Sequence, residues 1–518
     1  ESFRLEGKYS MLQYQGTSSM QYPIKNYRLN PRDQNGKVKL DPFLNGIKES
    51  RFTLKADSAS SGHWQNTGLA KWVNDNLYDY DENDQNSMNP MKWYSINNGG
   101  NLSDTRETIN GFPCRLILVN DGETPLNEGQ NEPTPGNTKD MGIFNFNNDK
   151  DNVKTLGLDR DIFPYCMSFE VASNSDTSAG AFFRYKGTDP AEELSYLQES
   201  FELRFPDSDD VGADYGYLNI DGDSGKGLKR VVDFVDNSSD EDFLANFDQY
   251  FNRDYTQRYY ILVIVLAMVD NLGKNMMLDT WDGIIWMPRF YDMDTICSFN
   301  NTGVITFDTD IEMEQGYWNT SASRLWTRVR DLMHDELIEK YKSMRQNGLS
   351  YESFMQYFYG EQIAKIPEAY YNKDYDVKYA PYADQYAGLA NGSSLEHLKR
   401  WLKRRIMFTD TLFDYAPSYT NDSLTIRANT TETMTLEIET YAPVYQHLSW
   451  YNNQMDKKKI DGKTSVTFTG KAQAATDQEV IIYGGSNIKR IRGIATMNPN
   501  SMLIGNATRL MELECTGA

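Results

Sequence analysis

The sequence predicts an α+β protein with a strand-rich first lobe, a mostly helical second lobe and a small β domain. Three observations support this prediction. Short alternating segments separated by Gly, Pro and Asn fill the beginning of the chain, helical spacing of apolar residues dominates after about residue 230, and short segments rich in Thr, Val, Ile and Tyr follow Pro417. A chain of 518 residues is also too long for one compact core.

The first lobe, residues 1–157, is predicted to hold several strands and one helix. Short apolar stretches flank the glycine-containing segment 15–19, which indicates a loop between two strands. Leu69, Trp72 and Val73 have helical spacing, so a helix is predicted over 64–77. Further strands are predicted at 52–55, 115–119 and 142–147.

The second lobe, residues 158–415, is predicted to be mostly helical. Ser238 and Glu241 form a capping box that opens a helical region. The apolar run at its end, 259–269, is far shorter than the ~20 residues of a membrane-spanning helix, so we expect a buried helix and no membrane span. A hairpin of two strands at 275–278 and 284–291 follows, and helices are predicted at 323–344, 350–366 and 394–413, the last one introduced by Ser393.

The end of the chain is predicted to be a small β domain at 416–487, of the sandwich type, with strands at 423–428, 433–440, 465–469 and 479–483. In the tail, 488–518, the spacing of Leu503, Leu510 and Leu513 is similar to the opening of a leucine-rich repeat. A single amphipathic strand and turn would give the same pattern. Both interpretations remain open at this stage.

Composition excludes several classes of function. The chain has 52 Lys and Arg against 74 Asp and Glu, a net charge of −22, which disfavours nucleic acid as a partner. The four cysteines form no C-x-x-C pair and the four histidines no H-x-x-x-H pair, so neither a disulfide framework nor a zinc site is indicated. Position 1 is Glu, and we expect the natural start to lie upstream.

Four polar residues in the second lobe have the spacing that phosphoryl transfer requires. Asp270 ends the apolar run, Asn275 follows five positions later, and the predicted hairpin leads to Asp292 and Asp294. A carboxylate must orient the attacking hydroxyl, while an amide oxygen and a second carboxylate hold the metal ion. Asp270 and Asn275 could instead simply end a helix and enter a turn, where both residue types are common.

These residues lie in segments that resemble the spore-coat protein H (CotH) family of atypical kinases. Residues 269–275 are similar to the family's N-x-D-G-H-x-x-N loop, and residues 286–294 to its P-W-D-x-D strand end. The earlier segments that resemble its R-G-N-S-S, P-K-K-S-Y, W-x-L-K-A and G-x-Y-x-x-x-E motifs are 15–19, 23–29, 52–57 and 142–150. All six segments follow the family's order, and the resemblance covers about residues 1–415.

The resemblance implies a bilobal protein-kinase-like fold that binds ATP with Mg²⁺ or Mn²⁺ and transfers phosphate to protein hydroxyls. By position, Asp270 would be the catalytic base, Asn275 and Asp292 would be metal ligands, and Asp294 would be a further ligand or orienting group. Residues predicted to bind the nucleotide phosphates are Gly16, Thr17, Ser18, Ser19 and Lys25. Lys25 could alternatively be a strand-edge lysine facing water.

Three departures from the family pattern each lose a charge near the expected nucleotide: Gln15, Ile24 and Asn148. The sequence therefore favours a CotH-like kinase module in a surface or virion-associated protein, with a nucleotide and a protein acceptor or neighbouring assembly subunits as partners. The alternative is a catalytically inactive kinase-fold component of a phage tail or cell-surface assembly. On either hypothesis we expect the protein at an extracellular surface or in a virion rather than in the cytoplasm.

Overall fold

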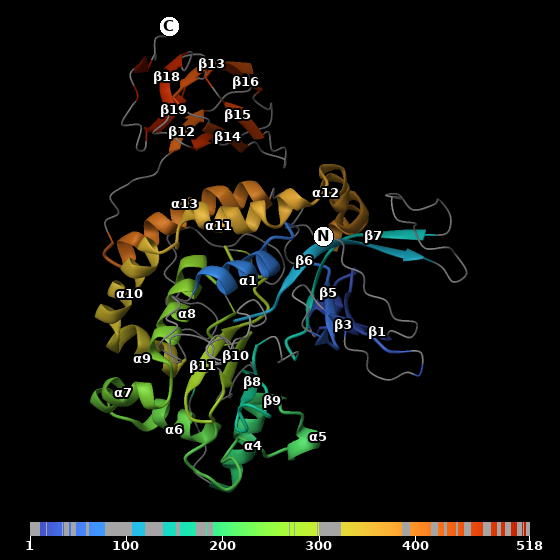
Figure 1. Ribbon diagram of the computed structural model, residues 1–518, viewed down its shortest axis with the longest axis vertical. Coiled ribbons are helices and arrows are strands. Elements are labelled where there is room, and N and C mark those ends of the chain that lie inside the picture. The colour runs from blue at the N-terminus through green and yellow to red at the C-terminus, as the bar shows by residue number, and fades with distance from the viewer. Residues whose placement is uncertain are drawn as a thin grey trace. The chain divides into compact units, whose positions relative to one another are not determined.

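The structure is a computed structural model that divides into two compact units: residues 1–390 with 402–414, and residues 391–401 with 415–518. It describes residues 11–16, 18–33, 35, 41–42, 48–58, 62–77, 106–119, 138–151, 156–171, 183, 190–268, 270–273, 275–297, 299, 323–385, 394–415, 423–428, 433–441, 444–449, 457–460, 462–469, 478–483, 488–492, 499–504, 510 and 512–513. The fold is α+β, as predicted, with helices and antiparallel sheets in the first unit and mainly strands in the second (Figure 1).

The first sheet of unit one has five strands in the order β1-β2-β5-β7-β6, all antiparallel. Its strands are β1 (Met11–Gln15), β2 (Asn26–Asn30), β5 (Phe52–Lys55), β6 (Gly111–Val119) and β7 (Thr138–Asn148). Apolar side chains from β5 and β7, among them Phe52, Phe144 and Phe146, form its core. The strands predicted in the first lobe are thus confirmed, with β6 and β7 longer than expected. A small pair, β3 (Asp41–Pro42) and β4 (Lys48–Glu49), accompanies them.

Helix α1 (Gln65–Asn76) confirms the predicted helix of the first lobe. Trp64 precedes it and is fully buried against Phe358, whose ring centre lies 5.2 Å away. A short 3₁₀ turn, η1 (Ser18–Gln21), follows the first strand. The packing of Trp64 and Trp72 fixes α1 because both indole rings are almost completely removed from water.

The second sheet of unit one contains the hairpin that the sequence predicted. Its order is β11-β10-β8-β9, and the strands are β8 (Met167–Val171), β9 (Phe201–Phe205), β10 (Met276–Thr280) and β11 (Trp286–Phe290). Helix α8 (Arg253–Leu266) lies beside this hairpin (Figure 1), and the ring of Tyr259 stacks on Phe290 with centres 4.1 Å apart. All residues from Tyr255 to Leu266 are buried, so the prediction of a buried helix is confirmed.

The helices before α8 correct one prediction. They are α4 (Pro190–Ser200), α5 (Ser208–Val211), α6 (Leu228–Asn237), α7 (Asp240–Asn246) and the 3₁₀ turn η3 (Phe247–Gln249). The predicted capping box was Ser238 with Glu241, but the cap of α7 is Ser239, whose hydroxyl accepts from Asp242 N at 3.1 Å. Ser238 instead closes α6 by donating to Phe234 O, because two adjacent serines serve the two neighbouring helix ends.

The helices after the hairpin are more interrupted than predicted. The range 323–344 holds two helices, α9 (Arg324–Leu332) and α10 (His334–Gln346), because Met333 leaves the helical conformation with φ −104° and ψ 20°. The range 350–366 holds α11 (Tyr351–Met355), the π-helical η4 (Gln356–Gly360) and the 3₁₀ turn η5 (Ile363–Lys365). Next come α12 (Glu368–Asp374), η6 (Tyr375–Tyr379), η7 (Ala380–Gln385) and α13 (Ser394–Leu412). Ser393, the predicted cap of α13, lies outside the described residues.

The second unit contains two sheets, antiparallel except for the parallel pair β18–β20, and confirms the strands predicted beyond residue 417. One sheet has the order β15-β14-β17-β12-β19 and the other β16-β13-β18-β20. The strands are β12 (Ser423–Ala428), β13 (Thr433–Thr440), β14 (Val444–Ser449), β15 (Lys457–Ile460), β16 (Lys463–Thr469), β17 (Gln478–Tyr483), β18 (Ile488–Arg492), β19 (Pro499–Ile504) and β20 (Glu512–Leu513). The tail strands β18 and β19 pair with β13 and β12. The leucine-rich repeat and the predicted domain boundaries stay predictions.

Candidate active site

The candidate site is built around the acidic turn that follows β11. Asp292, two residues after the end of β11, has φ 49°, and Asn275, directly before β10, has φ 52°. Asp and Asn tolerate this left-handed conformation better than other residues with a side chain, because their short polar groups bond locally. The hairpin therefore brings the two predicted metal ligands together: Asn275 Nδ2 donates to Asp292 O at 3.3 Å.

Asn271 fixes the same turn from the segment after α8. Its Nδ2 donates to Tyr291 O at 2.9 Å and to Asn275 O at 3.0 Å. Its backbone oxygen accepts from the hydroxyl of Tyr259 at 2.6 Å. Because Asn271 is fully buried, water competes little for these hydrogen bonds. They hold the loop after α8 against the end of β11.

A lysine that the sequence analysis did not single out occupies the centre of the site. Lys55, the last residue of β5, forms an ion pair with Asp292, and its ammonium lies 5.2 Å from the ring centre of Tyr291. Burial by itself would lower the pKa of Lys55, but the combined attraction of Asp292, Tyr291 and Asp294 raises it above its ordinary value. Lys55 is therefore a permanent positive charge beside the acidic turn.

Asp294 is the carboxylate with the most perturbed titration in this turn. Burial raises its pKa well above its usual range, and repulsion from Asp292 and Asp270 adds to this effect while Lys55 opposes it. Asp270, which is 5% exposed, is thus close enough for its charge to act on Asp294. The carboxyl groups of Asp270, Asp292 and Asp294 therefore interact electrostatically, and Asn275 joins them through its hydrogen bond to Asp292 O.

The predicted phosphate loop makes local contacts. Gly16 has φ 108°, and a Cβ there would meet Ser19 Oγ at 1.9 Å, so only glycine fits. Ser18 begins η1, and Ser19 Oγ donates to Gln15 O at 3.5 Å. Thr17 lies outside the described residues.

The ammonium of Lys25, which was predicted to contact phosphate, donates to Met20 O at 2.6 Å and Tyr22 O at 2.5 Å. This geometry fits neither of the two predicted environments closely, because the charge is turned toward main-chain carbonyls. Lys25 is linked to the site through its neighbour, since Asn26 Oδ1 accepts from Ala56 N at 2.7 Å, next to Lys55.

The donor set suits a magnesium or manganese ion. Two carboxylates, Asp292 and Asp294, and the amide of Asn275 are hard oxygen ligands, and Mg²⁺ usually takes only one or two carboxylates besides phosphate and water. Within the described residues no group of three or more His, Cys, Asp or Glu side chains forms a ready-made metal cage. A cation bound here would therefore complete its shell with the nucleotide, and its charge would offset the repulsion between Asp292 and Asp294.

A second buried network of charged side chains lies next to the end of β5, and the sequence did not predict it. His63 Nδ1 lies 2.8 Å from Asp57 Oδ2, and His63 Nε2 lies 2.6 Å from Asp374 Oδ2. Asp374 in turn accepts from Ile143 N at 2.5 Å and lies 3.7 Å from Lys378 Nζ. Since Asp57 follows Lys55 by two residues, this network anchors the end of the strand that carries the lysine of the site.

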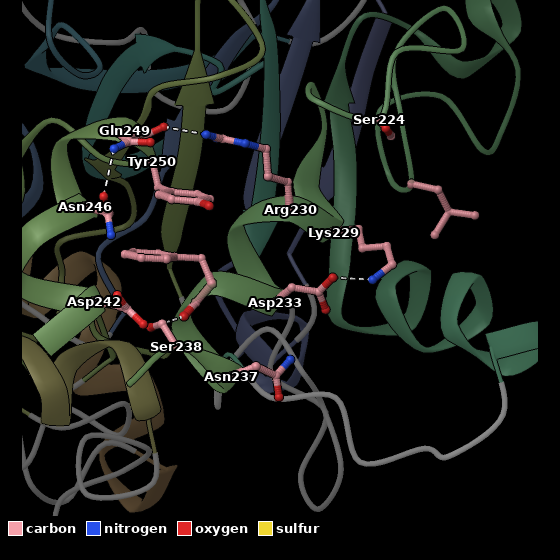
Figure 2. Close-up of a pocket in the computed structure, with 12 residues that line it drawn as sticks. Ser224, Lys229, Arg230, Asp233, Asn237, Ser238, Asp242, Asn246, Gln249 and Tyr250 are labelled. Carbon is pink, nitrogen blue, oxygen red and sulfur yellow. Dashed lines mark hydrogen bonds and ion pairs between the residues drawn. The ribbon is translucent and has the colours of Figure 1, made fainter. Parts of the chain in front are cut away.

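A separate pocket lies on α6, α7 and η3 (Figure 2). It has a volume of about 750 Å³, and two of its lining residues, Phe234 and the labelled Tyr250, stack with ring centres 3.8 Å apart. The guanidinium of Arg230 covers Tyr250 at 3.9 Å from the ring centre, so neither aromatic face is open to a ligand. None of the predicted site residues that the structure describes lines this pocket.

Comparison with known families agrees with the geometry of the acidic turn. The family model described as CotH kinase protein matches residues 184–409. This segment contains Asp270, Asn275, Asp292 and Asp294, and the match confirms the resemblance there. The first 183 residues, with Lys25 and Lys55, and the β unit beyond residue 414 lie outside the matched segment. No curated protein matches the chain in sequence. Among the described helices, none has both the length and the apolar character needed to cross a bilayer.

Proposed function

We propose that the unit matched by the CotH kinase family works as a CotH-like kinase that transfers phosphate from ATP to protein hydroxyls. The observation that supports this most strongly is the joining of Lys55 to the acidic turn, since a lysine from the first sheet meets Asp292 from the second. A cationic side chain and two carboxylates at one point are what a nucleotide with its metal ion needs. A bilobal kinase-like arrangement is part of this proposal.

Each residue then has a role that follows from its position. Asp292, Asp294 and Asn275 would hold the divalent cation, whose charge offsets that of the nucleotide phosphates. Lys55 would exchange its contact with Asp292 for a phosphate oxygen. Asp270, buried and close to the same group, would accept the proton of the acceptor hydroxyl as it attacks the terminal phosphate.

Substitution of Asp270 tests the proposal. A general base contributes to transfer and little to ground-state binding, so we expect Asp270→Asn to keep its ATP affinity within about twofold while transfer falls by roughly 10²-fold or more. The measurement is transfer of radiolabelled phosphate to the protein itself and to a generic acceptor protein, beside a binding assay. A wild-type protein that binds ATP and transfers nothing with either Mg²⁺ or Mn²⁺ would contradict the enzymatic role.

A second function is favoured by one observation. Lys55 already neutralises Asp292, and Gln15, Ile24 and Asn148 lack the charges that the family pattern has at these positions. A kinase fold without turnover could serve as a structural component of a phage tail or cell-surface assembly. That role predicts no phosphate transfer in the assay above. An unchanged melting temperature when ATP and Mn²⁺ are added would in addition remove nucleotide binding, since a bound nucleotide must raise it.

A further inference from the structure

The peptide unit between Asp292 and Met293 is held at both of its polar ends by asparagine side chains. Its carbonyl, Asp292 O, accepts from Asn275 Nδ2 at 3.3 Å. Its N–H, on Met293, donates to Asn66 Oδ1 at 3.2 Å. This peptide joins the two candidate metal ligands in sequence, so its orientation sets the directions in which Asp292 and Asp294 leave the backbone.

Asn66 reaches this peptide from a distant part of the chain. It lies in the first turn of α1, 227 positions away from Met293, and only 1% of its surface is exposed. Its Nδ2 has no hydrogen-bond partner within the described residues, so the side chain contacts the acidic turn through the hydrogen bond that its Oδ1 accepts from Met293 N. A leucine in its place would leave Met293 N as a buried donor without its partner, which is costly.

Helix α1 also holds the strand before the turn, through its other end. Asn74 Oδ1 accepts from Thr108 N at 3.0 Å, and Thr108 Oγ1 donates to Phe290 O at 2.7 Å. The two ends of α1 thus bracket the strand end, with Phe290 on one side and Met293 on the other. The first turn of α1 contains no acidic residue that could pair with Lys55.

We propose that Asn66 is a positioning residue for metal binding: it links α1 to the acidic turn and fixes the Asp292–Met293 peptide so that both carboxylates face one cation. This inference rests on the proposed function. Groups that orient metal ligands without touching the metal typically contribute 10-fold to 100-fold to affinity. Asn66 therefore controls metal affinity through the backbone, while Lys55 acts on the nucleotide directly.

The test compares four proteins in the presence of saturating ATP: wild type, Asn66→Leu, Asn66→Asp and Asn76→Ala. Leucine keeps the size of the side chain and removes the acceptor, whereas aspartate keeps the acceptor. Asn76 is the matched control, since it lies in the same helix and its Nδ2 donates to Trp72 O within α1. The readout is the Mn²⁺ concentration that gives half of the ATP-dependent rise in melting temperature.

We expect Asn66→Leu to raise that concentration by roughly 10-fold to 100-fold, with ATP binding in the absence of metal within about twofold of wild type. Asn66→Asp and Asn76→Ala should stay within a few-fold of wild type. If Asn66→Leu does not fold, Asn66→Ser takes its place, because its shorter hydroxyl cannot reach Met293 N. A half-saturating Mn²⁺ concentration equal to that of wild type, even with a lower melting temperature, means a purely structural role and overturns the inference.

Failure of the two proposals can be told apart. If wild type shows a metal-dependent response and the leucine or serine variant equals it, the positioning role is wrong and the proposed function stands. If wild type shows no response to ATP with Mn²⁺ or Mg²⁺, the proposed function is wrong and the inference falls with it. Hydrogen exchange of the Met293 amide adds a check without nucleotide, since it should be faster in Asn66→Leu than in wild type and unchanged in Asn76→Ala.

Discussion

At the scale of single residues, the site depends on which lysine carries the positive charge. Lys25 directly precedes β2 and Lys55 ends β5, two adjacent antiparallel strands, and the sequence pattern predicts a phosphate contact for Lys25 alone. The structure separates them by their partners. Lys25 holds carbonyls of its own turn, and Lys55 meets Asp292 across the two sheets.

Replacement of each lysine by methionine tests this distinction. Lys55→Met should weaken ATP binding by on the order of 10-fold to 100-fold, because a charge-assisted hydrogen bond contributes about 1.5–3 kcal/mol. Lys25→Met is the matched control and should cost less affinity, since its ammonium is already used by main-chain oxygens. Isothermal titration with ATP and Mn²⁺ measures both. A larger loss of ATP affinity in Lys25→Met than in Lys55→Met would mean that Lys25 contacts the phosphates, as the sequence predicted.

At the scale of elements, the end of β5 is held by a buried charged network. Asp57 and His63 come from the connection between β5 and α1, while Asp374 and Lys378 come from α12 and η6. Gly142 on β7 allows the side chain of Asp374 to come close to this strand. Its φ is 81°, and a Cβ there would meet Asp374 Oδ1 at 2.4 Å. The network joins the first sheet to the helices that follow α11.

Two glycines with nearly the same backbone angle provide a matched pair for stability. Gly222 has φ 80° and nothing within 4 Å of a Cβ, so Gly222→Ala should cost only the left-handed conformation, about 1–2 kcal/mol. Gly142→Ala should cost roughly 1–3 kcal/mol more, because Asp374 is held by His63 and cannot yield. Denaturant unfolding of the two variants measures the difference. Equal losses would show that the contact at Asp374 relaxes.

The same network predicts a dependence of stability on pH. Burial alone would lower the pKa of His63, but the charge of Asp374 and the hydrogen bonds that His63 donates to Asp374 and Asp57 outweigh burial and the repulsion of Lys378, and the pKa is raised. A raised pKa favours the protonated folded state, so this stability is fully present below pH 6.5 and is lost as the pH rises through the folded pKa.

The measurement is the free energy of unfolding of wild type and His63→Gln between pH 5 and pH 9. The excess stability of wild type over the variant should be largest at the acidic end and should shrink as the pH rises. His334→Gln is the control, because this exposed histidine lies at the start of α10, outside the buried network. A difference that grows with pH would mean that His63 is neutral in the folded protein.

At the scale of the whole molecule, the chain divides into two compact units. All residues proposed for the site lie in the first unit, and the second is built from two β sheets. A ligand that binds one unit stabilises that unit by mass action. Since multidomain chains commonly unfold in more than one transition, the two units should be distinguishable by calorimetry.

We expect ATP with Mn²⁺ to raise the transition of the first unit and to leave that of the β unit in place. Ile438→Ala assigns the transitions, because this fully buried residue of β13 should cost the β unit about 2–5 kcal/mol and leave the nucleotide response intact. Differential scanning calorimetry of the full chain measures both shifts. A nucleotide response that disappears in Ile438→Ala would show that the two units are coupled.

The sequence by itself determined the elements whose signals are local. The buried helix α8, the hairpin β10–β11 and the four polar residues from Asp270 to Asp294 follow from apolar runs, turn residues and fixed spacing over a few tens of positions. The cap of α7 was displaced by one residue to Ser239, because two neighbouring serines are both suited to a helix end, and the helices predicted at 323–344 and 350–366 are interrupted. Charge and spacing thus located one half of the candidate site.

Only the tertiary structure decided the other half. Lys55 meets Asp292 across 237 positions, Asn66 meets Met293 across 227, and His63 meets Asp374 across 311. No local pattern specifies such pairs, because alternation in a strand says which face a side chain takes and nothing about which residue will face it. The packing of sheets and helices determines which residues meet. Burial then strengthens the electrostatic attraction in these few polar contacts, because the protein interior screens charge less than water does.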